Sequence, residues 1–191
     1  MNNRGQATRA RLVDISSRLF AEYGYEGTSI EAVLHRANVS RGALYHHFDN
    51  KEALFEAVLE ELETDITRQV LEAGKDKSPV DALRAGCRAW IRLAAEPTVR
   101  RIVLIDAPAV LGWQQWREIE ERHALGLFKS VLDTLAEQGA LPAERADLWA
   151  HMLLASINEL ALLVANSEGS PESVTQAEAA ADDLLGRLLD S

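Results

Sequence analysis

Apolar residues recur every three or four positions along almost the whole chain, which is the spacing of helices that bury one face. The first such stretch covers residues 6–23, where Leu12, Ile15, Leu19 and Tyr23 share a stripe and Gly24 follows as a helix-ending residue. Alternating strand patterns are almost absent. The pattern therefore predicts an all-α fold of about nine helices.

Two short helices are expected after the first one. Thr28 and Glu31 have the spacing of a capping box, in which the Thr28 hydroxyl accepts from a helical amide and Glu31 reaches back, so a helix should follow over residues 29–37. Asn38 tolerates the left-handed conformation of a tight turn, and Ser40 can cap a second short helix.

The remaining helices are delimited by prolines, glycines and capping residues. A cap of the D-x-x-E kind at residues 49–52 opens a long helix, and proline suits the first turn of several later ones. The expected helices cover residues 51–73, 79–95, 97–108, 111–138, 142–165 and 171–189.

Two short helices joined by a tight turn form a helix-turn-helix, because neither is long enough to be stable alone. In the second of them, Leu44 and Phe48 lie four residues apart and should point into a core. The residues left outside suit phosphates and base edges, as in a recognition helix in the major groove of DNA. These outward positions are Arg41, Gly42, Tyr45, His46 and His47. Gly42 would let the backbone approach another surface closely.

Net charge at first argues against a polyanionic partner, since the 191 residues carry a formal charge of −10. The charge is unevenly distributed, however. Residues 1–52 hold 7 basic and 6 acidic side chains, and the acidic excess lies entirely in the remainder. Only the first quarter of the chain would therefore tolerate a phosphate backbone, although charge alone does not distinguish a DNA-binding segment from a merely neutral one.

At the turn and the second short helix, the chain resembles the tetracycline-repressor-like (TetR) transcriptional regulators. The matching residues are Gly27-Thr28-Ser29-Ile30 and the continuous segment from Ala37 to Leu54. The resemblance implies a DNA-binding domain over residues 1–52 and a helical ligand-binding and dimerisation domain over 53–191. It also implies a cytoplasmic homodimer that binds a two-fold operator, most often as a repressor, and is released by a small molecule.

The resemblance also implies roles for individual residues. Phosphate contacts are implied for Thr28, Ser40, Tyr45, His47 and Lys51. Sequence-reading positions are implied for Arg41, Gly42 and His46, and Tyr45 could serve either purpose. The adjacent His46 and His47 could instead suggest a metal site, but they point in different directions on a helix and lack a third ligand at helical spacing. No metal or cofactor is expected.

The C-terminal two-thirds contains all four tryptophans, and an aromatic-lined cavity between helices is a normal small-molecule site. We expect Trp113, Trp116, His123 and Asn158 to line such a pocket. Ordinary core packing of the tryptophans, and backbone or solvent partners for the polar residues, remain alternatives.

The last two helices are apolar on more than one face, which predicts a four-helix dimer interface unless both faces are covered within one chain. On the 142–165 helix, one stripe is Leu148, Met152, Ala155 and Leu162, and the other is Trp149, Leu153, Ile157, Leu160 and Val164. On the last helix, the expected interface stripe is Val174, Ala177, Ala181, Leu184 and Leu188.

Other classes of function find less support. The chain has no G-x-G-x-x-G, P-loop, H-E-x-x-H or G-x-S-x-G motif, so an enzyme is not indicated. Cys87, the single cysteine, lies among apolar helical residues and is expected to be a buried structural thiol. A helical interaction protein without DNA binding would leave the recognition helix unexplained. With no signal peptide or apolar run of about 18 residues expected, the predicted location is the cytoplasm.

Overall fold

The computed structural model describes residues 3–139 and 141–189, and this part of the chain is helical with no strand. The helices are α1 (Asn3–Gly27), α2 (Ile30–Ala37), α3 (Arg41–Tyr45), α4 (Lys51–Gly74), α5 (Pro79–Ala95), α6 (Pro97–Val99), α7 (Ala107–Leu111), α8 (Trp113–Glu120), α9 (Gly126–Glu137), α10 (Ala146–Asn166) and α11 (Pro171–Leu189). Wider π-helical turns, η1 (Arg100–Asp106) and η2 (Glu121–Leu125), join α6 to α7 and α8 to α9, and a short 3-10 turn, η3 (Ala143–Arg145), leads into α10. If α6–η1–α7, α8–η2–α9 and η3–α10 are each counted as one continuous helical segment, the described residues form nine helical segments. The all-α prediction is therefore confirmed.

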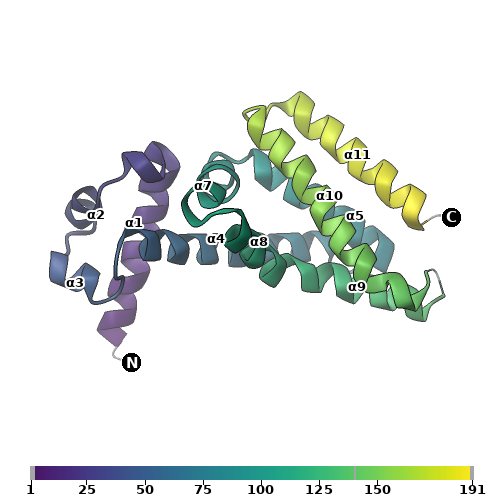
Figure 1. The fold of residues 1–191 in the computed structure, drawn as a ribbon, viewed down its shortest axis with the longest axis horizontal. Helices are drawn as coiled ribbons and strands as arrows, with labels where there is room; N and C mark the ends of the chain where they lie inside the picture. Colours follow the sequence, from purple (N-terminus) through teal and green to yellow (C-terminus); the bar gives the residue numbers. More distant parts are fainter. Residues whose placement is uncertain (1–2, 140, 190–191) are drawn as a thin grey trace.

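Helices α1, α2 and α3 form a small head at one end of an elongated molecule, and α4 runs from this head into the larger helical body (Figure 1). The head is built on the predicted core, since Leu12, Val33, Leu44 and Phe48 are all buried. Tyr23 was expected on the same stripe, but it is half exposed.

The turns of the head follow the sequence signals with two corrections. Asn38 adopts the left-handed conformation and the Ser40 hydroxyl accepts from the Ala43 amide, both as predicted. The predicted capping box is wrong, because Ser29 rather than Thr28 caps α2 and Glu31 pairs with Arg41 instead of reaching back. Similarly, the oxygen that caps α4 belongs to Asn50. In both cases the residue directly after the predicted cap accepts a hydrogen bond from the amide three positions further along the helix.

Two connections hold the head against the body. Phe20 and Tyr25 from α1 pack edge-to-face on Phe55 of α4, with ring centroids 5.2 and 5.1 Å apart. The Tyr25 amide also donates a hydrogen bond of 2.7 Å to the carboxylate of Asp106, a buried residue in η1. Helix α4 and the η1 turn therefore both couple the head to the body.

The body packs α5 centrally between α4, α10 and α11, with α9 closing one side. The long helix predicted over residues 111–138 is interrupted at Gly112, which has φ of +83° and separates α7 from α8. Pro108 does not end its helix as predicted. The widened η1 turn precedes it and continues into α7, which tolerates a residue without an amide hydrogen.

Helix α10 corrects the expectation that no apolar run reaches membrane-spanning length. Residues Ala143–Asn166 are long and apolar enough to cross a membrane by composition, with a mean hydropathy of 1.6. The helix nevertheless contacts α5, α9 and α11, and Leu153, Ile157 and Val164 are buried there. Its apolar character is thus explained by packing in the body on one face.

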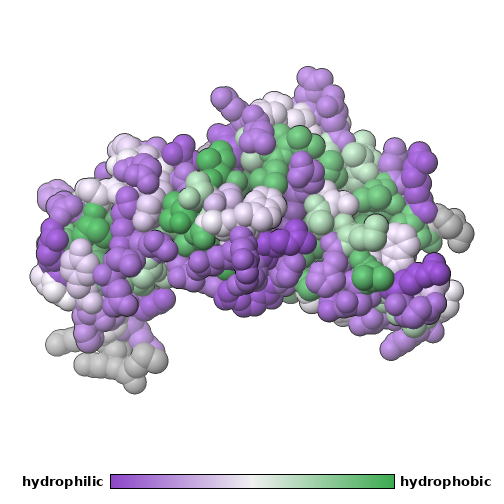
Figure 2. Space-filling model, viewed as in Figure 1, coloured by the Kyte–Doolittle hydropathy of each residue, from purple (hydrophilic) through white to green (hydrophobic). Residues whose placement is uncertain are grey.

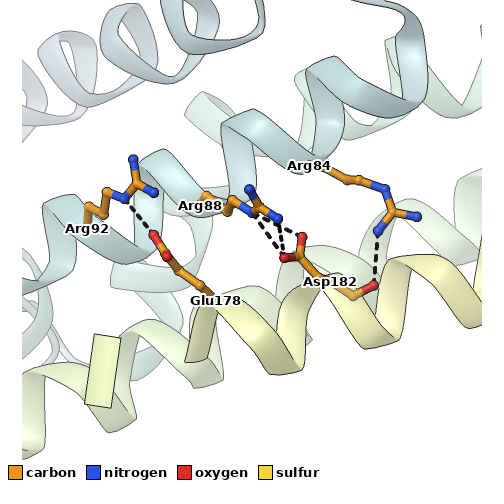
Figure 3. Close-up of polar contacts among 5 residues, drawn as sticks. All are labelled: Arg84, Arg88, Arg92, Glu178 and Asp182. Carbon is orange, nitrogen blue, oxygen red and sulfur yellow. Dashed lines mark hydrogen bonds and ion pairs between the residues drawn. The ribbon is translucent and has the colours of Figure 1, made fainter. Parts of the chain in front are cut away.

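Helix α11 is fixed along α5 within the same chain. Its Glu178 pairs with Arg92 of α5 and its Asp182 pairs with Arg88, while Arg84 donates to the Asp182 carbonyl (Figure 3). Between these contacts, Ala177 and Ala181 are buried. The two alanines of the predicted stripe therefore pack within the chain, because their small side chains allow α11 to approach α5 closely, whereas Val174, Leu184 and Leu188 of the same stripe are only half-buried.

Candidate DNA-binding face and effector cavity

Helix α3 presents the predicted recognition residues on the outer surface of the head. Arg41, Gly42, Tyr45 and His46 are exposed, while Leu44 on the opposite side is fully buried. A side chain at Gly42 would meet nothing within 4 Å, so this part of the helix is open to a large partner. The Arg41 guanidinium lies 6.0 Å from the Tyr45 ring centre and pairs with Glu31, which keeps it at the edge of the helix.

Ser40 and His47 flank this exposed face. The Ser40 oxygen caps α3, which leaves its hydroxyl hydrogen for an outside acceptor. The His47 ring is half buried and packs edge-on against His46, with ring centroids 5.1 Å apart. Both residues are on the same end of the molecule as the recognition residues.

Thr28 and Lys51, by contrast, are bonded inside the head. The buried Thr28 hydroxyl donates to the carbonyls of Leu19 and Gly24, at 3.1 and 2.8 Å. The Lys51 ammonium donates to the carbonyls of Tyr25 and Thr28, at 2.8 and 3.1 Å, and lies 3.9 Å from the centre of the Tyr25 ring. An ammonium has three donors, so these two hydrogen bonds use two of the three donors of Lys51.

A cavity of about 250 Å³ lies in the body between α4, α5, α9 and α10. Its walls are largely apolar and include Ile66, Leu83, Phe128 and Ile157. This volume is slightly below the roughly 300 Å³ at which ligand pockets usually begin, which suits a compact small molecule.

The four residues predicted to line a pocket are placed differently from one another. Asn158 lines this cavity. Trp113 and Trp116 contact each other, with ring centroids 4.8 Å apart, and line a second, smaller hollow of about 160 Å³ that Asn158 also borders. His123 instead points to α4, where its Nε2 lies 2.8 Å from a Glu60 oxygen.

The cavity also contains a polar cluster that the sequence analysis missed. Glu63 of α4 and Glu120 of α8 are both buried and line the cavity. The Trp90 indole donates to Asn158 at 3.0 Å, and the Asn158 amide donates to Glu120 at 2.8 Å. Glu63 could have been found in the sequence, because it lies four residues after Leu59 and three before Ile66, on the buried face of its helix.

Burial changes the ionisation of both carboxyl groups. Loss of hydration raises the pKa of Glu63 well above its usual value, and the adjacent charge of Glu120 raises it further. Loss of hydration also raises the pKa of Glu120, although its hydrogen bonds from Glu63 and Asn158 oppose this. Of the two acids, Glu63 has the more strongly raised pKa, so it is the first to take up a proton, which it can share with Glu120.

Cys87 lies in the wall of the same cavity and is buried, as predicted. Burial raises the pKa of its thiol to about 12. The thiol is therefore protonated at neutral pH and unsuited to nucleophilic chemistry.

An uncovered apolar strip runs along α10 on the side away from the body. It consists of Leu148, Met152, Ala155 and Leu163, which are exposed at helical spacing together with Glu159. Leu148, Met152 and Leu163 each expose more than half of their surface. In Figure 2, hydrophobic surface interrupts the hydrophilic surface along the course of α10.

The exposed helix-turn-helix head, set on a helical body that contains a cavity, defines the architecture of a DNA-binding transcriptional regulator. Comparison with known families agrees with this class. Residues 12–58 match the bacterial regulatory proteins of the tetR family, and residues 80–188 match the tetracyclin repressor-like C-terminal domain. The chain belongs to the TetR family of DNA-binding transcriptional regulators.

Individual relatives extend the similarity over most of the chain. The chain is 24% identical to the Tn10 TetC protein of Escherichia coli over 148 residues, which is 78% of this chain and 75% of that protein. It is 26% identical to the HTH-type transcriptional regulator BetI of Burkholderia mallei over 174 residues, covering 78% of this chain and 89% of BetI. The crystal structure of a TetR-family regulator from Pectobacterium atrosepticum matches with a TM-score of 0.86 and 31% identity, over 100% of this chain and 98% of that one.

Proposed function

We propose that this regulator is a cytoplasmic repressor that binds a two-fold operator as a homodimer and is released by a small molecule. The observation that carries this proposal is the separation of two sites in one fold: an exposed recognition helix on the head and an apolar cavity in the body. Binding of DNA operators by dimers and response to small molecules are general properties of the family. In this proposal, residues 1–52 are the DNA-binding domain and residues 53–191 the effector and dimerisation domain.

At the DNA, we assign sequence reading to Arg41, Gly42 and His46, and phosphate contacts to Ser40, Tyr45 and His47. The exposure of Tyr45 leaves it able to serve either role. Lys51 has two of its three donors satisfied within the head, so it offers a single donor to a phosphate and stiffens the turn before α2. The buried Thr28 hydroxyl supports that same turn by bonding to α1.

The dimer contact is assigned to the exposed strip of α10 rather than to the buried alanines of α11. A short recognition helix reads too few base pairs alone, so a symmetric dimer is needed to read two half-sites. An apolar helix face paired with its symmetry mate is the usual way to build such an interface.

The release mechanism we propose is a shift between two arrangements of the heads. Helix α4 begins at Lys51 beneath the head and its second half lines the cavity, so an occupant of the cavity contacts the same rigid helix. At 1.5 Å per residue, its 24 residues span about 36 Å. The bond between Tyr25 and Asp106 gives a second route from body to head. A small molecule that fits better in one arrangement would shift the population toward it.

Selection of binding sites from a random duplex library tests the DNA-binding part of this proposal. We expect a two-fold site to be enriched, with affinity that falls steeply as salt increases. His35→Ala, on the exposed surface of α2, is a matched control for variants of the recognition helix. Affinity that does not depend on salt, or the recovery of no preferred site, would argue against the proposal.

A further inference from the structure

The polar end of the cavity is formed by two acids with unused hydrogen-bonding capacity. Glu63 and Glu120 each expose only 4% of their surface. One oxygen of each carboxyl group, Oε1, is buried without a hydrogen-bond partner among the described residues. Buried polar atoms are nearly always paired, so these two carboxyl oxygens in the wall of one cavity can accept from a donor that enters it.

The cluster is held in a fixed orientation. Trp90 donates to Asn158 and Asn158 donates to Glu120 Oε2, so the three side chains form a chain of hydrogen bonds that ends on the acid pair. Glu120 is thereby fixed through one oxygen while its other oxygen stays unpaired. Such a preorganised acceptor can bind a donor without first rearranging.

The charges around the pair favour a cation over an anion. The nearby bases Arg122 and His123 are directed to Glu60, on the same helix as Glu63. Lys75, which directly follows α4, is the basic residue that lines the cavity; it comes 12 positions after Glu63, a rise of about 18 Å along the helix axis. Burial raises the pKa of both acids, and when Glu63 holds a proton and Glu120 is ionised the pair presents one negative charge in apolar surroundings.

We infer that the cavity binds a compact organic cation: an apolar or aromatic body that carries a single protonated nitrogen. The ammonium donates to Glu63 and Glu120, and the body lies against the apolar wall that includes Ile66, Leu83 and Phe128. This inference deepens the proposed function, since it names the chemical class of the effector. An organic carboxylate of the same shape is disfavoured, because it would place like charge beside the acid pair.

Three probes of nearly equal shape separate these chemistries: 4-phenylbutylamine, 4-phenylbutan-1-ol and 4-phenylbutanoate. Binding to the full-length protein is measured by isothermal titration calorimetry without DNA. We expect the amine to bind at least about tenfold more tightly than the alcohol, because a hydrogen bond to a buried charge is stronger than a neutral one. The carboxylate should bind most weakly.

Substitutions then assign the preference to the acid pair. Glu120→Gln and Glu63→Gln both keep the size of the side chain. Glu120→Gln removes the more readily ionised acid and should lower amine affinity about tenfold, while the affinity for the alcohol changes less than about threefold. Glu63→Gln replaces the more readily protonated acid and should lower amine affinity less. Glu61→Gln, an exposed position on the same helix, is the matched control and should change neither. Circular dichroism establishes that each variant is folded, and if neither glutamine variant folds, the order of the three probes on the parent protein decides.

The inference is overturned if the alcohol or the carboxylate binds as tightly as the amine, if the amine binds Glu120→Gln as tightly as it binds the parent protein, or if no probe binds at millimolar concentration. Operator binding is measured on the same samples. A protein that prefers the amine but binds no operator refutes the proposed function and leaves this inference standing. A protein that binds its operator but shows no preference for the amine does the reverse.

Discussion

Substitution of Gly24 by alanine should weaken the connection between head and body. Gly24 breaks α1 with φ of +72° and ψ of 172°, a backbone region that is essentially restricted to glycine. A Cβ at this position would lie 1.9 Å from the Arg101 Nη2 atom, so the guanidinium would have to move. Arg101 would then lose its ion pair with Asp106, the same carboxylate that accepts from the Tyr25 amide.

The expected cost has two parts. A non-glycine residue in this backbone region costs about 1–3 kcal/mol, and the more restricted unfolded chain returns about 0.4–1 kcal/mol of this. The ion pair lies 3.2 Å apart and its arginine is 44% exposed, so its loss adds at most about 1 kcal/mol. At about 2–4 °C per kcal/mol for a protein of this size, Gly24→Ala should lower Tm by several degrees.

Gly112→Ala is the matched control, because Gly112 has nearly the same backbone angles but a side chain there would meet nothing within 4 Å. Gly112→Ala should cost only the backbone term, so it should lower the free energy of unfolding by about 1 kcal/mol less than Gly24→Ala does. Thermal unfolding followed by circular dichroism at 222 nm measures both variants. In a double-mutant cycle, Arg101→Ala should remove the difference that is specific to Gly24→Ala. The reasoning is refuted if Gly24→Ala is no more destabilising than Gly112→Ala, or if the cycle shows no coupling.

The remaining predictions concern the dimer, the DNA contacts and the buried acids. Met152→Glu should yield a folded monomer in sedimentation with weak operator binding in DNA titration, and a Met152→Glu protein that stays dimeric would place the interface elsewhere. Ala181→Glu should instead destabilise the fold itself by about 3 kcal/mol or more, because it buries a charge against α5. His46→Ala should change the preferred sequence in library selection by about 1–3 kcal/mol of discrimination, and an unchanged site with lower yield would place His46 at a phosphate. Lys51→Ala should weaken binding to all DNA sequences alike and flatten the slope of log affinity against log salt concentration by about one unit, and an unchanged slope would exclude a phosphate contact. The variant should also lower the stability of the head by about 1.5–3 kcal/mol, because it loses the hydrogen bonds to Tyr25 and Thr28. Glu63 has a raised pKa in the folded state, so the folded protein binds more protons and loses stability as pH rises above the usual glutamate range. Glu63→Gln should therefore raise Tm more at pH 8 than at pH 4.5, and a gain that does not change with pH would show that folding does not raise the pKa of Glu63.

The sequence alone determined the helical fold and the recognition helix, because both depend on local information. The spacing of Leu44 and Phe48 fixed which side of α3 faces the core, and this also fixed the exposed side that carries Arg41, Gly42 and His46. Turn residues such as Asn38 and Ser40 act on their own neighbouring amides, so their conformations could be predicted without knowledge of the fold.

Only the tertiary structure decided which apolar faces are covered within the chain. The stripes on α10 and α11 are equivalent as patterns, yet Ala181 is buried against α5 while Met152 is 60% exposed. Apart from Asn158, the lining of the cavity could not be predicted for the same reason, since its walls come from helices distant in the sequence. Glu63 and Glu120 lie 57 positions apart, and their pKa values are raised because folding removes both from water into one apolar site, which no local pattern encodes.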